Sequence, residues 1–207
     1  YGLWLARANF NRQSLRSLLG REGGIDRPHV YLMQPYDPNR RIIVMLHGLA
    51  SSPEAWVELA NEIQGDENLR QHYQIWQVYY PTNMPIALNH AAIRKALEDT
   101  LAHFDPSGQA PASSDLVLIG HSMGGVIARL MVSSTDQSLV QLARDRGRLT
   151  PKQIERIDPM LRFEPFPHVS RAIFIAAPHR GTSIAGKPLG RWMAGFIRFP
   201  VTVLEEL

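Results

Sequence analysis

The sequence predicts an α/β fold, in which helices cover both faces of a mostly parallel β-sheet. Two features of the chain carry this prediction. Short apolar runs alternate with amphipathic helical segments, which is the order expected when strands and helices are joined by right-handed crossovers. Two of the runs, IIVML at Ile42–Leu46 and DLVLI at Asp115–Ile119, are almost entirely apolar, as in strands buried on both faces.

The composition limits the class of protein. The chain has 207 residues, of which 44% are hydrophobic and 20% charged, so it forms one globular domain or most of one. It has no cysteine, which excludes disulfides and thiolate metal sites. The net charge is only +3 and the arginines of the N-terminal part form no basic block, so no nucleic-acid partner is indicated. No apolar run approaches the roughly 18 residues of a membrane span.

Residues 1–28 are expected to form a helical extension, and residues 29–207 the α/β domain. The segment YGLWLARANFNRQSLRSLLG combines basic and apolar residues up to Gly20, so this helix either packs against the domain or lies on a membrane surface. The chain begins with Tyr1 rather than methionine, which is compatible with the removal of a signal peptide or anchor.

Five strands and three main helices are predicted within the domain. The helices are recognised by apolar residues spaced three or four apart, and the strands by short apolar or alternating runs. A polar loop, DPSGQAPASS, separates the second helix from the fourth strand. The predicted strands are His29–Gln34, Ile42–Leu46, Tyr73–Tyr80, Asp115–Ile119 and Ala172–Ala177, and the predicted helices span about residues 51–63, 86–104 and 122–133.

The first helix carries two competing signals for its start. Pro53 directly after Ser52 is typical of a first helical position, whereas Ser51-x-x-Glu54 matches a capping box. The two signals imply different N-cap residues, and both remain open at this point. The apolar face of this helix consists of Trp56, Leu59, Ala60 and Ile63, and that of the second helix of Ile93, Leu97, Leu101 and Phe104.

Residues 134–170 are long for a connection between a helix and a strand. They contain a helix start at LTPKQIERI, a proline-rich end at FEPFPHV and a group of large apolar residues. This group either packs the segment onto the sheet or belongs to a lid over an acyl-binding pocket, since long inserted loops often cover active sites. Its members are Met160, Leu161, Phe163 and Phe166.

Ser122 is the candidate nucleophile. It lies in LVLIGHSMGGVIARLM, between a predicted buried strand and the next helix, and the carboxyl ends of parallel strands are where α/β folds place active groups. Gly120 and Gly124 leave out side chains that would clash in a sharp strand-to-helix turn, which His121 completes. Such a turn raises the serine hydroxyl above the sheet, beside a helix N-terminus that favours developing negative charge.

A second turn, MLHGLASS, follows the strand Ile42–Leu46 and is predicted to face the same site. His47 and Gly48 shape this turn so that the amide of Leu49 points inward, and the amide of Met123 follows the serine. Together the two N–H groups would form an oxyanion hole for a tetrahedral intermediate. The alternative is that both turns merely connect strands to helices.

The eight histidines offer no clear general base. His179 follows both Ser122 and a predicted strand, so it is either the base or, as we favour, a residue that shapes a loop near the site. Asp158 precedes the fifth strand, which is an unusual place for a catalytic acid. No cluster of His, Asp or Glu has metal-ligand spacing, so no metal site is predicted. Surface or packing roles are expected for His29, His72, His90 and His103.

These motifs resemble the α/β-hydrolase superfamily, and within it the bacterial lipase and esterase branch. The resemblance covers about residues 29–185 and rests on His47-Gly48, the GHSMG elbow and APHRGT at Ala177–Thr182. It implies a serine nucleophile, a carboxylate and a histidine in that chain order, no cofactor, and an ester or lipid-like small-molecule substrate. It also implies a bacterial protein, expected in the cell envelope or periplasm rather than the cytoplasm.

The chain departs from the family pattern after its fifth strand. In the family the acid follows the second strand after the elbow and the histidine follows the third, so we expect two further strands after Leu207 that carry them. The predicted activity is hydrolysis of carboxylic esters through an acyl-enzyme on Ser122. An acyltransferase or amidase would use the same residues, and a non-catalytic binding module of the same shape is the alternative outside enzymes. The sequence does not indicate an oligomeric state.

Overall fold

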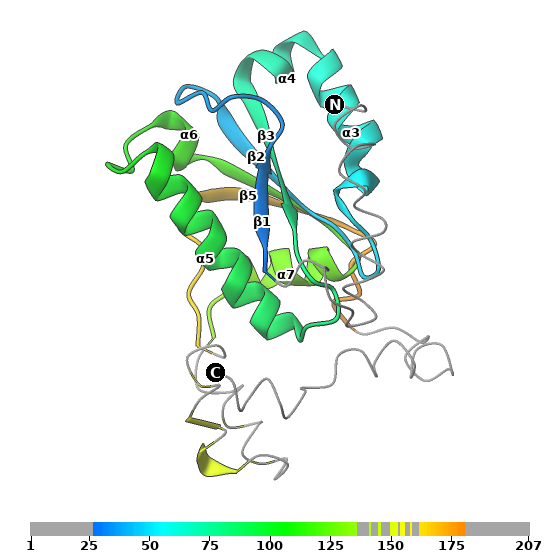
Figure 1. Cartoon of the computed structure of the whole chain (residues 1–207), viewed down its shortest axis with the longest axis vertical. Helices are drawn as coiled ribbons and strands as arrows, with labels where there is room; N and C mark the ends of the chain where they lie inside the picture. The colour runs from blue at the N-terminus through cyan, green and yellow to red at the C-terminus, as the bar shows by residue number, and fades with distance from the viewer. Residues whose placement is uncertain are drawn as a thin grey trace.

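A mixed five-stranded sheet forms the centre of the molecule (Figure 1). The computed structural model describes residues 27–135 and 162–180, together with residues 141, 145, 150–152, 154–155 and 158. The strand order is β1-β3-β2-β4-β5, with β1 antiparallel to β3 and the other pairs parallel. The strands are β1 (His29–Leu32), β2 (Arg41–Leu46), β3 (Tyr73–Tyr79), β4 (Leu116–His121) and β5 (Val169–Ile175).

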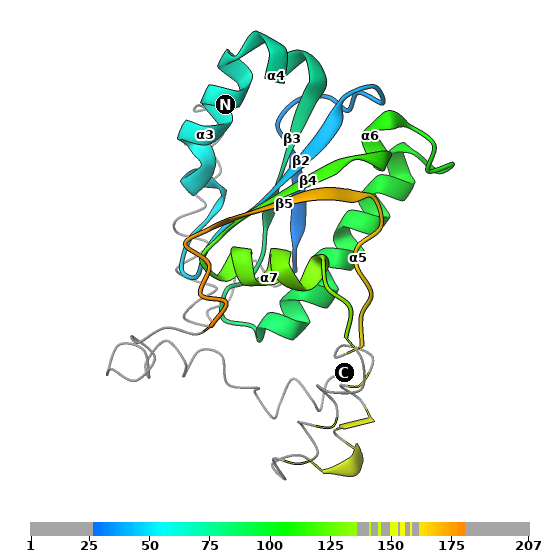
Figure 2. The ribbon, with the colours of Figure 1, turned by 180° about the vertical axis from the view of Figure 1, so that it is seen from behind.

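Helices cover both faces of this sheet, as the sequence predicts (Figures 1 and 2). The chain steps from β2 to β3 in one direction and from β3 to β4 in the other, so right-handed crossovers put α3 on one face and α5 and α7 on the opposite face. The helical segments are η1 (Pro53–Trp56), α3 (Val57–Gly65), α4 (Glu67–His72), α5 (Ile86–Phe104), α6 (Pro111–Ser114) and α7 (Met123–Met131).

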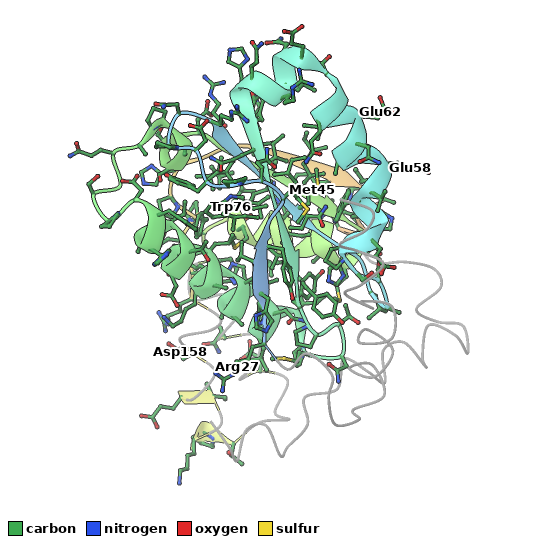
Figure 3. The ribbon with its side chains drawn as sticks, turned by 45° about the horizontal axis from the view of Figure 1, so that its top comes forward. Arg27, Met45, Glu58, Glu62, Trp76 and Asp158 are labelled. Carbon is green, nitrogen blue, oxygen red and sulfur yellow. The ribbon has the colours of Figure 1, made fainter. Side chains whose placement is uncertain are left out.

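The central strands are buried on both faces, which explains their nearly continuous apolar runs. In β2, Val44 and its alternate neighbours pack with α5 and α7, whereas Met45 packs with residues of η1 and α3. Figure 3 shows Met45 and Trp76 in the interior and Glu58 and Glu62 on the outer side of α3. The fifth strand differs, because Ile173 is 46% exposed on the face of β5 that continues the α3 side of the sheet.

The predicted helices and strands are present, with some shifted ends. The first helix begins as the 3-10 turn η1, with Ser52 at the N-cap and Pro53 as its first residue, so the proline signal marks the start. Strand β5 begins three residues earlier than predicted, because Val169 already pairs with Leu116. The sequence does not predict α4 or α6, because both are short and neither has the repeated apolar spacing that marks a helix.

The end of the 134–170 segment packs onto the domain. Phe166 is 3% exposed, and its backbone N–H donates to the carbonyl of Met131 at 2.6 Å. Packing onto the domain therefore accounts for Phe166. Met160 and Leu161 lie outside the described residues, so the lid stays a prediction. Nearly all of the predicted extension at residues 1–28 also lies outside them. In the described part of the chain, no helix has both the length and the apolar character needed to cross a bilayer.

The double burial of the central strands predicts a large cost for truncating one of their side chains. Leu118 in β4 is 0% exposed, so Leu118→Ala is expected to lower the free energy of unfolding by about 2–5 kcal/mol. Leu69 on α4 is 37% exposed, and Leu69→Ala is expected to change it by no more than about 0.5 kcal/mol. Urea unfolding measures both, and equal effects of the two substitutions would contradict the packing described.

Candidate active site

The predicted nucleophile and the predicted oxyanion turn lie at the carboxyl ends of adjacent strands. Leu46 of β2 pairs with Gly120 of β4, so the two turns leave the sheet at the same level. One turn leads to α3 on one face and the other to α7 on the opposite face. This reversal of direction is the switch point where open α/β sheets place their ligand sites.

Ser122 adopts a backbone conformation that side-chain-bearing residues rarely take. Its φ is 52° and its ψ is −118°, and it is the N-cap of α7. Its backbone N–H donates to the carbonyl of Ile175 at 2.9 Å, which ties the elbow to β5. Ala50 (φ 52°) and Ala176 (φ 48°) are also in the left-handed region, so the ends of β2, β4 and β5 all carry this strain. Strain of this kind costs on the order of 1–3 kcal/mol per residue and clusters at functional sites.

The glycines of the elbow allow the backbone of α7 to touch the backbone of the sheet. A Cβ on Gly124 would lie 2.2 Å from the carbonyl oxygen of Leu46 and 2.4 Å from that of His47. A Cβ on Gly120 would lie 2.4 Å from the carbonyl oxygen of Gly124. Both glycines therefore remove the side-chain clash proposed from the sequence. Gly125 has the same role, because its Cβ would lie 2.5 Å from the Cβ of Ala177.

The His47–Ala50 turn passes directly beside the nucleophile. A Cβ on Gly48 would lie 3.2 Å from the Cβ of Ser122 and 3.0 Å from Nδ1 of His121. The backbone of Gly48 therefore occupies space where any side chain would crowd the serine. Met123 is the first residue of α7. Like the N–H of any first helical residue, its backbone N–H has no acceptor within the helix.

His47 is held inside the protein as a neutral imidazole. Its side chain is buried, and this burial lowers its pKa to about 4. The N–H of Tyr80 donates to Nε2 at 3.4 Å, so Nδ1 carries the proton and donates to the carbonyl of Gly48 at 3.0 Å. Both ring nitrogens are thus engaged, which suits a turn-shaping residue and excludes His47 as the general base.

The remaining candidates do not complete a catalytic set among the described residues. His179 is exposed, and its ring lies edge-on to Phe174, with centroids 4.9 Å apart. Asp158 pairs with Arg162 at 2.5 Å. Within the described ranges, neither a histidine nor a carboxylate is hydrogen-bonded to the Ser122 hydroxyl, and no group of three His, Asp or Glu side chains could hold a metal ion. The roles given to Ser122, Leu49 and Met123 stay predictions.

The four histidines expected to have surface or packing roles lie outside the two turns, and one of them is unusual. His29 begins β1, His72 ends α4, and His103 lies on the exposed end of α5. His90 on α5 is 1% exposed and packs against the ring of Phe163 at 4.6 Å. Burial, together with the positive charge of Arg94, lowers the pKa of His90 to about 4. It is therefore a packing residue, as expected.

The sequence model of the alpha/beta hydrolase family matches residues 43–206, which include both turns and the nucleophile elbow. The chain belongs to the alpha/beta hydrolase family. This confirms the resemblance noted in the sequence, and a hydrolase is the enzyme class that the membership supports. No match was found among curated proteins.

Solved structures similar to this alpha/beta hydrolase include bacterial esterases and lipases. The mature lipase of Bacillus licheniformis is 18% identical with a TM-score of 0.47, and the alignment covers 82% of this chain and 56% of the lipase. Esterase 2 of Thermogutta terrifontis, phosphonylated by sarin, is 13% identical with a TM-score of 0.48, at coverages of 86% and 60%. The chain therefore spans 60% of the length of these structures at most.

Three residues beside the site were missed by the sequence analysis. Tyr80 and Thr82 follow β3, and Asn89 lies in the first turn of α5. A signal for Tyr80 and Thr82 was present in the sequence. They are polar residues that follow β3, and β3 lies beside β2, the strand that leads into the predicted oxyanion turn. Asn89 gives no such signal, because an asparagine inside a helix is ordinarily exposed.

Because the backbones of α7 and β2 touch at Gly124, even the smallest side chain at this position is expected to destabilise this alpha/beta hydrolase strongly. Gly124→Ala places a methyl group against two backbone oxygens, so α7 has to move away from β2, and we expect a loss of about 1–3 kcal/mol or more. Gly65→Ala is the matched control, since a Cβ there meets nothing within 4 Å at the end of α3 and is expected to be neutral or slightly stabilising. Urea unfolding compares the two, and a Gly124→Ala protein as stable as the parent would refute the contact.

Proposed function

We propose that the protein is a serine hydrolase that cleaves carboxylic esters of lipid-like or other small molecules through an acyl-enzyme on Ser122. The observation that carries the proposal is the position of Ser122, which is strained at the start of α7, with the backbone of Gly48 beside its Cβ. The Ser122 hydroxyl thus lies next to a helix N-terminus and next to a turn in which the N–H of Leu49 donates to no other backbone group of the described residues.

The proposed reaction begins with attack of the Ser122 Oγ on the ester carbonyl carbon. The serine proton passes to a general base, and the carbonyl oxygen becomes an oxyanion that the N–H groups of Leu49 and Met123 stabilise. Collapse of the intermediate expels the alcohol, which takes the proton from the base and leaves an acyl-serine. Water then attacks the acyl group by the same steps, which releases the acid and restores the serine.

The proposed base is a histidine that follows a further strand, oriented by a carboxylate, as the order of the family motifs implies. His47 does not fill this role because both of its ring nitrogens are engaged. An acyltransferase or an amidase would differ only in the acceptor or the leaving group, so the products distinguish them from an esterase.

The nucleophile is tested by covalent labelling of the full-length protein. A fluorophosphonate probe is expected to label Ser122, and Ser122→Ala is expected to abolish both labelling and hydrolysis of p-nitrophenyl butyrate. Ser114→Ala is the matched control, because Ser114 is exposed on α6 and its hydroxyl only donates to the carbonyl of Pro111 at 3.0 Å. Intact-protein mass spectrometry and initial rates measure both effects. Labelling that survives in Ser122→Ala would assign the nucleophile to another residue.

The oxyanion turn is tested by a side chain at Gly48. Gly48→Val adds atoms beside Ser122 and His121, so it displaces the Leu49 amide, and loss of one oxyanion donor lowers kcat by roughly 10²- to 10³-fold. Gly65→Val introduces the same side chain at the end of α3 and is expected to leave kcat near the parent value. Circular dichroism and thermal melting check the fold of both. A folded Gly48→Val protein with the parent kcat would show that this turn is not the oxyanion loop.

A further inference from the structure

The oxyanion turn is held in place by the end of a strand that contributes no predicted catalytic group. The Tyr80 hydroxyl donates a short hydrogen bond to the carbonyl of His47, and the Tyr80 backbone N–H donates to Nε2 of the same residue. At the other end of the turn, the N–H of Ala50 donates to Oγ1 of Thr82 at 3.2 Å. Tyr80 and Thr82, in the loop after β3, therefore hold the two ends of the turn, with Gly48 and Leu49 between their contact points.

The packing around Tyr80 and Thr82 leaves these hydrogen bonds little freedom. The rings of His47 and Tyr80 are stacked, with centroids 4.3 Å apart and planes inclined by 14°. Tyr80 is 1% exposed and Thr82 is 3% exposed. Burial raises the pKa of the Tyr80 hydroxyl above its usual range, so it remains a hydrogen-bond donor wherever the protein is folded.

The support extends into α5. Asn89 is fully buried, and its amide donates to the carbonyls of Pro81 at 2.9 Å and Met84 at 3.3 Å. These two bonds fix the loop between β3 and α5, which contains Thr82. The turn at the nucleophile is thus connected through hydrogen bonds to a long helix on the α5–α7 face of the sheet.

The hydrogen bonds around the turn fix the direction of the Leu49 amide. Nδ1–H of His47 holds the carbonyl of Gly48, and that carbonyl shares a planar trans peptide with the N–H of Leu49. The N–H of Leu49 therefore points to the side opposite the buried imidazole. The Tyr80 hydroxyl holds the carbonyl of His47 at the start of the turn, so loss of this hydroxyl loosens the turn that orients the Leu49 amide.

We propose that Tyr80 and Thr82 are positioning residues of the oxyanion hole, which hold the His47–Ala50 turn so that the Leu49 amide meets the oxyanion. The inference rests on the proposed function, because it assigns these residues to the same reaction. A positioning residue of this kind affects the transition state more than the ground state, since the amide gains its full hydrogen bond only when the oxyanion forms.

The test is a set of hydroxyl deletions in the full-length protein. Thr82→Val keeps the shape of the side chain and removes the acceptor for the N–H of Ala50. Tyr80→Phe removes the hydroxyl that donates to the carbonyl of His47 and keeps the backbone N–H. Each substitution is expected to lower kcat for p-nitrophenyl butyrate about tenfold and to change KM less than about twofold. This loss of kcat is smaller than the roughly 10²- to 10³-fold loss caused by removal of a whole oxyanion donor. Thr82→Ser restores the hydroxyl and is expected to return kcat to within about threefold of the parent.

A transition-state analogue supplies a readout that a purely structural role would not move. An alkyl trifluoromethyl ketone forms a hemiketal oxyanion on the serine, so its Ki is expected to rise about tenfold in Thr82→Val and Tyr80→Phe, in parallel with the fall in kcat. Tyr73→Phe and Thr100→Val are the matched controls. They remove hydroxyls from the start of β3 and from α5 and are expected to leave kcat and Ki unchanged.

The outcomes separate this inference from the proposed function. If Ser122→Ala abolishes activity while folded Thr82→Val and Tyr80→Phe proteins keep the parent kcat and Ki, the positioning role is wrong and the serine mechanism stands. A rise in KM with unchanged kcat would also overturn it. If Ser122→Ala remains active, the proposed function itself falls, whatever the effect of the hydroxyl deletions. Thermal melting verifies that each variant is folded.

Discussion

The site depends on one close approach between backbones, that of α7 against the carboxyl end of β2. Gly124 lies so near the carbonyl oxygens of Leu46 and His47 that no Cβ fits between them. This contact sets how far the first turn of α7 lies above the sheet, and the chain has to bend sharply after Gly120 to reach it. The left-handed conformation of Ser122 follows from that bend, as does its position beside Gly48. The packing of α7 and the candidate site therefore use the same few atoms.

The strain at this edge of the sheet is offset by hydrogen bonds from neighbouring strands. Ser122 has its N–H bonded to the carbonyl of Ile175, and Ala50 has its N–H bonded to Thr82. Unfavourable backbone conformations persist only where the surroundings over-determine them, and here the loop after β3 and strand β5 provide that restraint. A preorganised turn needs no rearrangement when charge develops, which is the condition under which backbone amides stabilise an oxyanion most strongly.

The two polar tasks of such a site are divided between different residues. His47 has both ring nitrogens engaged and a pKa of about 4, so it orients the backbone and stays neutral. The proposed mechanism needs a histidine with a free nitrogen near Ser122, and the histidines of the described ranges are not bonded to that hydroxyl. The proposed mechanism therefore assigns orientation of the turn and proton transfer to different residues, even though a histidine suits both.

The sequence by itself determined the order of strands and helices, the double burial of β2 and β4, and the two turns with Ser122 and Gly48, because these follow from local periodicity and from glycines at strand ends. Only the tertiary structure decided that Tyr80, Thr82 and Asn89 support the turn, because hydrogen bonds between the end of β3 and the His47–Ala50 turn join residues about 33 positions apart and leave no periodic signal. It also decided the start of the first helix at Pro53, since the sequence carries two start signals one residue apart and does not rank them. Strain at Ala50 and Ala176 was equally invisible, because an alanine takes a positive φ only when its neighbours force it to.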